Sequence, residues 1–135
     1  MLVGSYGSLV MKDNAIKIPK KLQGDFKSSI IVSFDASLEC IVIIPIERLP
    51  KIQKKAEKAN SMFVSILNNS KTYLVEKPEV LKIDPNFLQL AGIKRECVFL
   101  GMLDYVELWD KEKFESYFAN MDEEYIKEQL KKFGF

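Results

Sequence analysis

Short stretches of alternating apolar and polar residues run through this chain, and such alternation is typical of β-strands that bury one face. Residues 15–18 read Ala-Ile-Lys-Ile before Pro19, and residues 80–83 read Val-Leu-Lys-Ile before Asp84 and Pro85. Further strand-length apolar stretches lie at 29–34, 40–44, 97–100 and 105–109. The pattern therefore predicts a protein built mainly of short strands.

Prolines and charged amphipathic stretches predict helices between and after these strands. A proline that follows a strand ends the hydrogen-bonded ladder and can open a helix, so short helices are expected at 19–23 and 85–91. Gly92 is well placed to cap the second of these at its carboxyl end. Longer helices are expected where charged and apolar residues combine, at 47–60, 60–69, 111–120 and 122–135.

Two pairs of segments align without a gap at the same shift. Residues 9–18 align with 74–83, and residues 41–44 align with 106–109, in both cases 65 positions apart. A common shift indicates an internal duplication. We therefore expect a first repeat at 1–60, a linking helix and second repeat at 61–121, and an amphipathic C-terminal helix at 122–135. Because one half buries little core by itself, the two halves are expected to share one small barrel.

Composition is that of an ordinary globular protein, and it removes several kinds of chemistry. Of the 135 residues 47% are hydrophobic and 29% are charged, and no apolar run reaches the roughly 18 residues that span a bilayer. Histidine is absent, which excludes Ser-His and Cys-His nucleophile systems and the commonest metal ligand. Cys40 and Cys97 both lie in apolar stretches and are expected to be buried, reduced thiols. We therefore expect no enzyme activity, no metal site, no cofactor and no small-molecule substrate.

Positive charge is concentrated in the first part of the chain. Residues 1–60 carry ten Lys and Arg against six Asp and Glu, whereas residues 61–135 carry ten against thirteen. Lysines surround the strand at 15–18 and the helix start that follows it, where cations and backbone donors together favour phosphate. The candidate DNA-binding residues are Lys12, Asn14, Lys17, Lys20, Lys21, Lys77 and Lys82. The same lysines could instead keep an exposed strand edge unpaired, so the pattern alone leaves both interpretations open.

Several motifs resemble the MraZ family. Residues 104–117 read Asp-Tyr-Val-Glu-Leu-Trp-Asp-Lys-Glu-Lys-Phe-Glu-Ser-Tyr, which looks like the family's strand ending in Trp-Asp-Lys, followed by an aromatic helix. Residues 62–67 look like its inter-repeat helix, residues 1–6 like its opening strand, and Ile18-Pro19 like its Ile-Pro in the first repeat. The resemblance runs over nearly the whole chain. It implies an α+β, mainly β fold: a two-repeat AbrB-like swapped-hairpin β-barrel with helices packed on one side.

The family's signature motif is poorly kept in this chain. In each repeat the motif runs from Asp through Gly or Asn to Arg, ahead of a proline. Ala15 and Val80 stand at the two arginine positions, and Asn14 alone fits the motif in the first repeat. Lysine holds a phosphate as a point charge, whereas arginine can fork onto guanine. Loss of both arginines should therefore weaken base reading more than general attraction to DNA.

The resemblance implies a DNA-binding transcriptional regulator that acts as a ring-shaped homo-oligomer on repeated promoter boxes of cell-division and cell-wall genes, and that represses its own operon. Its partners would be double-stranded DNA and further copies of the chain, and it would not bind a membrane. It would be located in the cytoplasm, associated with the nucleoid. The apolar strand at 106–109 is expected to bury surface against neighbouring subunits, with Trp109 as a core or interface anchor. The alternative is a degenerate family member that assembles but serves as an interaction scaffold, with weak or no specific DNA binding.

Overall fold

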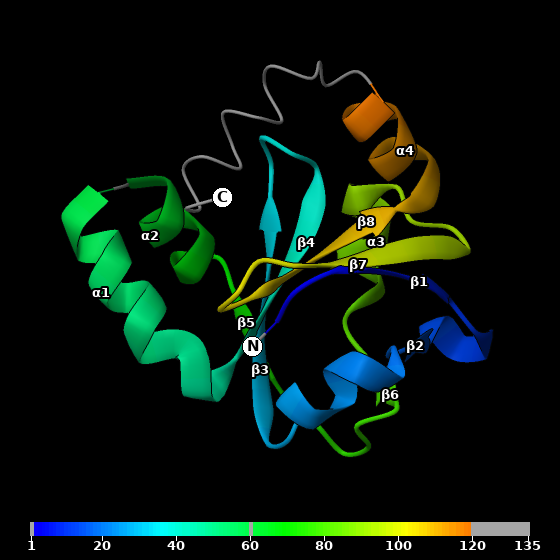
Figure 1. The fold of residues 1–135 in the computed structure, drawn as a ribbon, viewed down its shortest axis with the longest axis horizontal. Coiled ribbons are helices and arrows are strands. Elements are labelled where there is room, and N and C mark those ends of the chain that lie inside the picture. Colours follow the sequence, from blue (N-terminus) through cyan, green and yellow to red (C-terminus); the bar gives the residue numbers. More distant parts are fainter. Residues whose placement is uncertain (1, 60, 120–135) are drawn as a thin grey trace.

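The computed structural model describes residues 2–59 and 61–119 of the chain (Figure 1). Its strands are β1 (Ser5–Leu9), β2 (Ile16–Lys17), β3 (Ser29–Asp35), β4 (Cys40–Pro45), β5 (Lys71–Leu74), β6 (Val80–Leu81), β7 (Glu96–Gly101) and β8 (Val106–Asp110). Its helices are α1 (Leu49–Ala59), α2 (Ser61–Asn68), α3 (Pro85–Ala91) and α4 (Lys111–Ala119), with short 3₁₀ helices η1 (Lys12–Asn14), η2 (Lys20–Asp25) and η3 (Ile46–Arg48). The helix expected at 122–135 lies outside the described residues. Among those described, no helix combines the length and the apolar character that a membrane crossing requires.

The local pattern gave most of these elements, with small shifts at their ends. The strands expected at 29–34, 40–44, 97–100 and 105–109 are β3, β4, β7 and β8. The short helix expected at 85–91 is α3, and Gly92 ends it in the left-handed conformation, with φ of +69°. The α+β, mainly β class is therefore confirmed.

Most strands form one antiparallel sheet in the order β1-β7-β8-β4-β3-β5, while β2 and β6 form a separate two-stranded ribbon. A closed barrel would require the edge strands β1 and β5 to pair with each other. Instead the ribbon lies between them, and its strands are only two residues long because Pro19 and Pro85 soon end the ladder. In the part of the chain that the structure describes, the expected closed barrel is therefore not seen, and the sheet keeps two edges.

Strands of the two halves are interleaved. β1 pairs with β7 and β5 pairs with β3, so each outer pair of the sheet joins one half to the other. Ile16 pairs with Leu81 in the ribbon, and Val42 pairs with Glu107 at the sheet centre. Both pairs are 65 positions apart, which is the shift of the sequence alignment. A two-repeat arrangement would produce this register, and the swapped-hairpin description stays a prediction.

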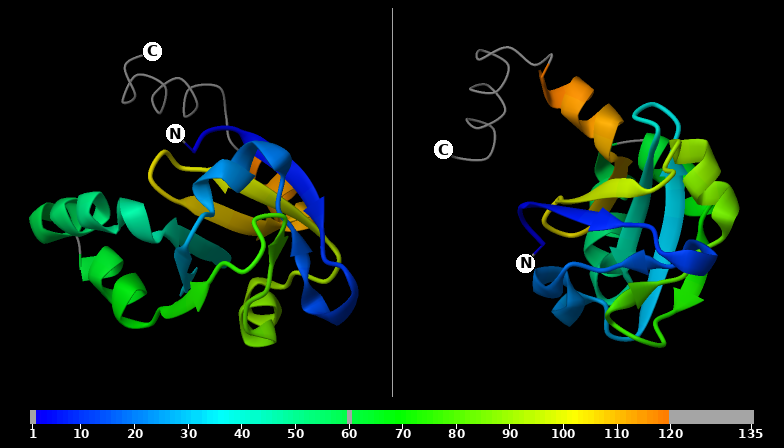
Figure 2. Two further views of the ribbon diagram at one scale, coloured as in Figure 1. Left: turned by 90° about the horizontal axis from the view of Figure 1, so that it is seen from below. Right: turned by 90° about the vertical axis from the view of Figure 1, so that its right-hand side faces the viewer.

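Apolar side chains cover both faces of the sheet. One cluster joins Ile16 of the ribbon and Phe87 of α3 to alternate residues of the sheet such as Phe99. The other joins Val42 of β4 to Ile52 of α1 and Ile66 of α2 on the opposite face. Figure 2 shows α1 and α2 in green, apart from β2 of the ribbon in blue. The expectation of helices on one side only was wrong, because β4 is buried at every position and needs a cover on both faces.

The strand expected to meet neighbouring subunits lies inside the subunit. β8 pairs with β4 on one side and β7 on the other, and its residues from Val106 to Trp109 are buried. Trp109 packs against three aromatic rings of α4, at centroid distances of 6.2 Å to Phe114, 5.2 Å to Tyr117 and 6.2 Å to Phe118. Trp109 is thus a core anchor, and the interface expected on this strand was wrong because the strand is central in the sheet.

Candidate nucleic-acid interface

Two turns lead into the ribbon of β2 and β6, one into each strand. In the first turn Asp13 and Asn14 take left-handed φ values of 63° and 59°, which Asp and Asn tolerate better than most residues. The turn is closed by a backbone hydrogen bond from the Met11 N–H to the Ala15 carbonyl, at 2.6 Å. Asn14, an expected DNA contact, therefore also has a structural role in the turn.

The second turn connects β5 to β6 and is attached to the first half of the chain at both ends. The Val75 N–H donates to the Ser28 carbonyl at 2.7 Å, just before the turn. The Ile18 N–H donates to the Glu79 carbonyl at 2.9 Å, just after β2. Glu79 is thereby placed directly beside the strand that carries Lys17.

Three of the expected lysines share one cleft of about 730 Å³, which we call the first cleft. Lys12 reaches it from the first turn, Lys77 from the second, and Lys82 from the end of β6. Ala15 and Val80, which occupy the arginine positions of the family motif, line the same cleft. The structure therefore brings together parts of both halves that are distant in the sequence.

Two other expected lysines line a second cleft, of about 910 Å³, on the side of the ribbon nearer β1. Lys17 and Lys20 lie there with Lys111 of α4, which the sequence pattern did not single out. The Ser8 hydroxyl donates a hydrogen bond to the carbonyl of Lys17 and joins β1 to the ribbon. Lys111 is itself paired with Glu96, with 3.7 Å between Nζ and Oε1. Only a contact between α4 and β7 could have revealed Lys111, and the sequence does not carry that signal.

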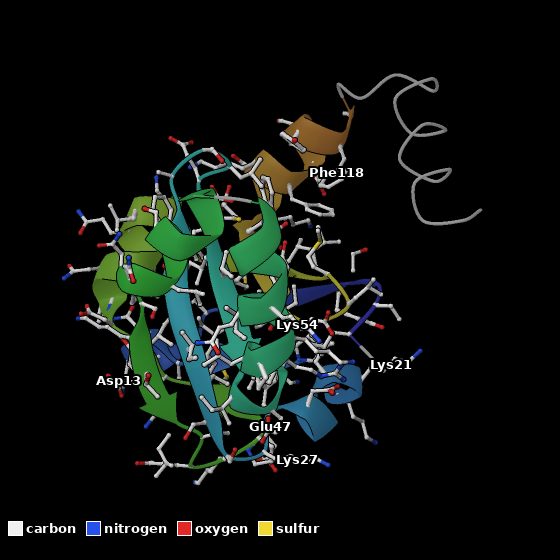
Figure 3. The ribbon with its side chains drawn as sticks, turned by 90° about the vertical axis from the view of Figure 1, so that its left-hand side faces the viewer. Asp13, Lys21, Lys27, Glu47, Lys54 and Phe118 are labelled. Atoms are coloured by element: carbon white, nitrogen blue, oxygen red, sulfur yellow. The ribbon has the colours of Figure 1, made fainter. Side chains whose placement is uncertain are left out.

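Asn14 and Lys21 line neither cleft. Figure 3 shows Lys21 extending outward from η2, on the opposite side of the view from Asp13. The expected residues thus form a band that follows the ribbon and η2 rather than one compact cluster. Ile18 lines both clefts, so the clefts adjoin across β2.

The lysines of this band are available to a ligand. The expected lysines are all exposed, namely Lys12, Lys17, Lys20, Lys21, Lys77 and Lys82. Within residues 2–59 and 61–119 none of them forms an ion pair or a side-chain hydrogen bond. The band also carries acidic side chains, because Asp13 and Glu76 line the first cleft. An ammonium that is exposed and unpaired can hold phosphate with little desolvation cost.

A separate group of acidic side chains lies buried at the sheet centre. Ligand-type atoms of Asp35, Cys40 and Glu107 lie within 4.8 Å of one another. Burial raises the pKa of the Cys40 thiol far above its usual range, and a protonated thiol is a poor metal ligand. Glu107 accepts a hydrogen bond from the indole N–H of Trp109 at 3.2 Å. Its side chain also forms a hydrogen bond with the Cys40 thiol. These contacts describe a hydrogen-bonded part of the core.

Comparisons with known proteins agree with the motifs of the second half. The chain matches the family described as "MraZ protein, putative antitoxin-like" over residues 81–133. It is 27% identical to the transcriptional regulator MraZ of Clostridium tetani over 99% of both chains. It is 26% identical to that of Lachnoclostridium phytofermentans, over 99% of this chain and 98% of the relative. The transcriptional regulator MraZ of Mycoplasmoides gallisepticum is 28% identical, over 90% of this chain and 91% of that protein.

The class that these relatives define is one of transcriptional regulators and not of enzymes. The resemblance seen in the sequence is thereby confirmed: the chain is similar to proteins of the MraZ family over nearly its whole length.

Proposed function

We propose that this protein is a DNA-binding transcriptional regulator of the MraZ type. The observation that carries the proposal is the band of exposed, unpaired lysines on the ribbon and η2, in a chain whose relatives are named as transcriptional regulators. Lysines hold the phosphate backbone through charge, and such binding releases counterions and weakens steeply with salt. Because Ala15 and Val80 replace the forked arginines of the motif, the expected binding is only modestly selective for sequence.

The proposed form of the regulator is a ring-shaped homo-oligomer on repeated promoter boxes. Several weak contacts on one ring multiply their effective concentration, so a chain without arginine readout can still hold a repeated site. The family resemblance suggests cell-division and cell-wall genes as targets, repression of its own operon, and a place in the cytoplasm at the nucleoid. Exposed apolar side chains support association, among them Leu9 on β1 and Leu74 on β5.

The test is a binding titration against the DNA just upstream of the protein's own gene and against a random duplex of equal length, across a salt series. Lys20→Ala with Lys21→Ala is expected to weaken binding similarly on both duplexes, because both lysines act on phosphate. Each lost contact should reduce the magnitude of the log–log salt slope by about 0.9. Lys51→Ala with Lys54→Ala is the matched control, because these exposed lysines lie on α1, which packs on the opposite face of the sheet. If the variant with Lys20→Ala and Lys21→Ala binds DNA at low salt as tightly as wild type, this face is not the DNA surface.

One observation favours a second candidate, an assembly scaffold that binds DNA weakly or not at all. Both arginine positions of the motif line the first cleft as Ala15 and Val80, and Glu76 lines it too. Retention on heparin separates the candidates. A regulator is retained at low salt and released as salt rises, whereas a scaffold passes through.

A further inference from the structure

The two turns of the ribbon line the same cleft but differ in charge. The first turn and its continuation through β2 and η2 carry Lys12, Lys17, Lys20 and Lys21 against one carboxylate, that of Asp13, before Asp25 closes η2. The second turn reads Glu76-Lys77-Pro78-Glu79, with two carboxylates against one lysine. If each half used its turn in the same way, the two turns would be expected to carry similar charge.

Backbone contacts hold the acidic turn against the basic strand. The Ile18 N–H donates to the Glu79 carbonyl at 2.9 Å, and the next residue, Val80, is the register partner of Lys17. Glu76 lines the first cleft together with Lys12. A phosphate held at Lys12 would share the first cleft with the Glu76 carboxylate, and Glu79 lies beside the strand that carries Lys17. Such charges act over a screening length of about 10 Å at 0.1 M salt.

Nothing among the described residues neutralises the two carboxylates. Glu76 and Glu79 are exposed, and within residues 2–59 and 61–119 neither forms an ion pair. They also make no side-chain hydrogen bond there that would give them a structural role. Their charge is therefore free to act on an approaching ligand.

We infer that Glu76 and Glu79 limit the affinity of each subunit for DNA, so that a single contact is weak and only several subunits together hold a site. This inference rests on the proposed function and adds the role of the second turn to it. The carboxylates oppose phosphate on every sequence alike, so they lower binding to isolated random DNA without reading bases. Selectivity then comes from the number of contacts that a repeated site offers at once.

The test uses the full chain and duplexes of two kinds, the upstream DNA and a random duplex of equal length. Glu76→Gln and Glu79→Gln, each alone and combined, keep side-chain size, and the Glu79 backbone bond does not depend on the side chain. Each single variant is expected to bind both duplexes about two- to fivefold more tightly at low salt, the range of exposed charge interactions. The gain should shrink as salt rises.

Glu112→Gln is the matched control. Glu112 is an exposed carboxylate on α4, and its loss changes the net charge by the same amount as either single variant. Its affinity for both duplexes should change less than that of either variant in the second turn, because α4 lies away from that turn and Glu112 lines neither cleft (Figure 1). Thermal melting of every variant should match wild type, since none of these side chains is buried.

The outcomes separate this inference from the proposed function. If wild type binds DNA and the Gln variants bind with the same affinity, the inference is overturned, whereas the proposed function as a DNA-binding regulator stands. Weaker binding of the Gln variants to the upstream DNA alone also overturns it, because the carboxylates would then be reading bases, as glutamate can at cytosine N4. If neither wild type nor the double variant binds any duplex, the proposed function falls as well.

Discussion

Glu107 is a buried acidic residue at the centre of the sheet, and its environment raises the pKa of its carboxyl. Burial raises its pKa, the nearby charge of Asp35 raises it further, and the bond from Trp109 opposes both effects. The titratable groups facing it from the described strands are Asp35 of β3, Cys40 of β4 and Tyr105 of β8, which precedes it by two residues. All of these groups are neutral or negative, so the ionised form of Glu107 has no cation beside it there.

Glu107→Gln is therefore expected to stabilise the fold increasingly as pH rises. When folding raises the pKa of an acid, that acid does not lower the free energy of unfolding at a pH below its pKa in the unfolded chain, which is about 4.3. The loss of stability grows as pH rises through the pKa in the folded protein. The amide oxygen of Gln can still accept the bond from Trp109. Thermal melting should show equal midpoints near pH 4 and a gain of a few degrees for the variant near pH 8. A lower midpoint for the variant at every pH would contradict this account.

The two thiols are expected to be unreactive in the folded protein. Cys40 and Cys97 are free and buried, which confirms the sequence-based expectation of buried, reduced thiols. Burial and, to a smaller extent, the charge of Asp110 raise the pKa of Cys97 to about 12, so the reactive thiolate is scarce at neutral pH. A bulky thiol reagent should label neither cysteine in native protein and both in denaturant. Rapid native labelling would show that the described packing opens readily.

At the scale of the elements, α3 has both ends fixed by local contacts. Asp84 accepts a hydrogen bond from the Asn86 N–H at 3.0 Å, and Pro85 occupies the first turn. The Lys71 ammonium lies 2.7 Å from the other carboxylate oxygen of Asp84, which ties the helix start to β5. Gly92 ends the helix in a left-handed conformation, where its N–H returns to the Gln89 and Leu88 carbonyls.

Replacing Asp84 should separate the cap from the ion pair. Asp84→Ala removes both and should lower the melting midpoint by a few degrees, whereas Asp84→Asn keeps the cap and should lower it less. The bond with Lys71 lowers the pKa of Asp84, so the stability it supplies is present above the unfolded value of about 3.9 and is lost as pH falls through the folded value. The difference between wild type and Asp84→Asn should therefore vanish in acid. A constant difference down to low pH would show that the ion pair is not its source.

For the whole molecule, the open sheet leaves two edges that a neighbouring copy can cover. β1 and β5 end the sheet, and each exposes a leucine, with Leu74 at 74% and Leu9 at 45%. Unpaired strand edges with apolar residues favour association. These edges, and not the buried β8, are therefore where we expect subunits to meet. Because Leu9 lines the second cleft and Leu74 the first, a neighbouring copy there would border both clefts.

We predict a closed homo-oligomer in sedimentation at micromolar concentration. Leu9→Lys with Leu74→Lys should shift the protein toward smaller species, because lysine on an edge strand opposes pairing. Leu90→Lys is the control, because Leu90 is also exposed but lies on α3. A stable wild-type monomer would contradict the predicted assembly. An unchanged double variant would place the interface elsewhere.

Local sequence predicted elements wherever burial leaves a periodic trace. The apolar stretch of β4 and the Asp84-Pro85 start with Gly92 end of α3 are such traces, and both elements were found. The strand β5 was missed. Among its residues only Tyr73 is half-buried and the others are exposed, so no alternation of apolar and polar positions marks it. The prediction of a closed barrel was wrong because closure depends on how far the ribbon strands extend. The sequence shows only that a proline follows each of them.

The sequence by itself determined most of the strands, the ends of α3, the buried thiols and the excess of lysine in the first half, because each depends on neighbouring residues or on composition. Only the tertiary structure decided which charges meet. Lys12 shares a cleft with Lys77 and Glu76, and Glu79 lies beside the strand of Lys17, because β2 pairs with β6 across 65 positions of chain. Helices on both faces and the burial of β8 likewise follow from strand order. Pairing between distant strands is set by how the whole core closes, and no local pattern records it.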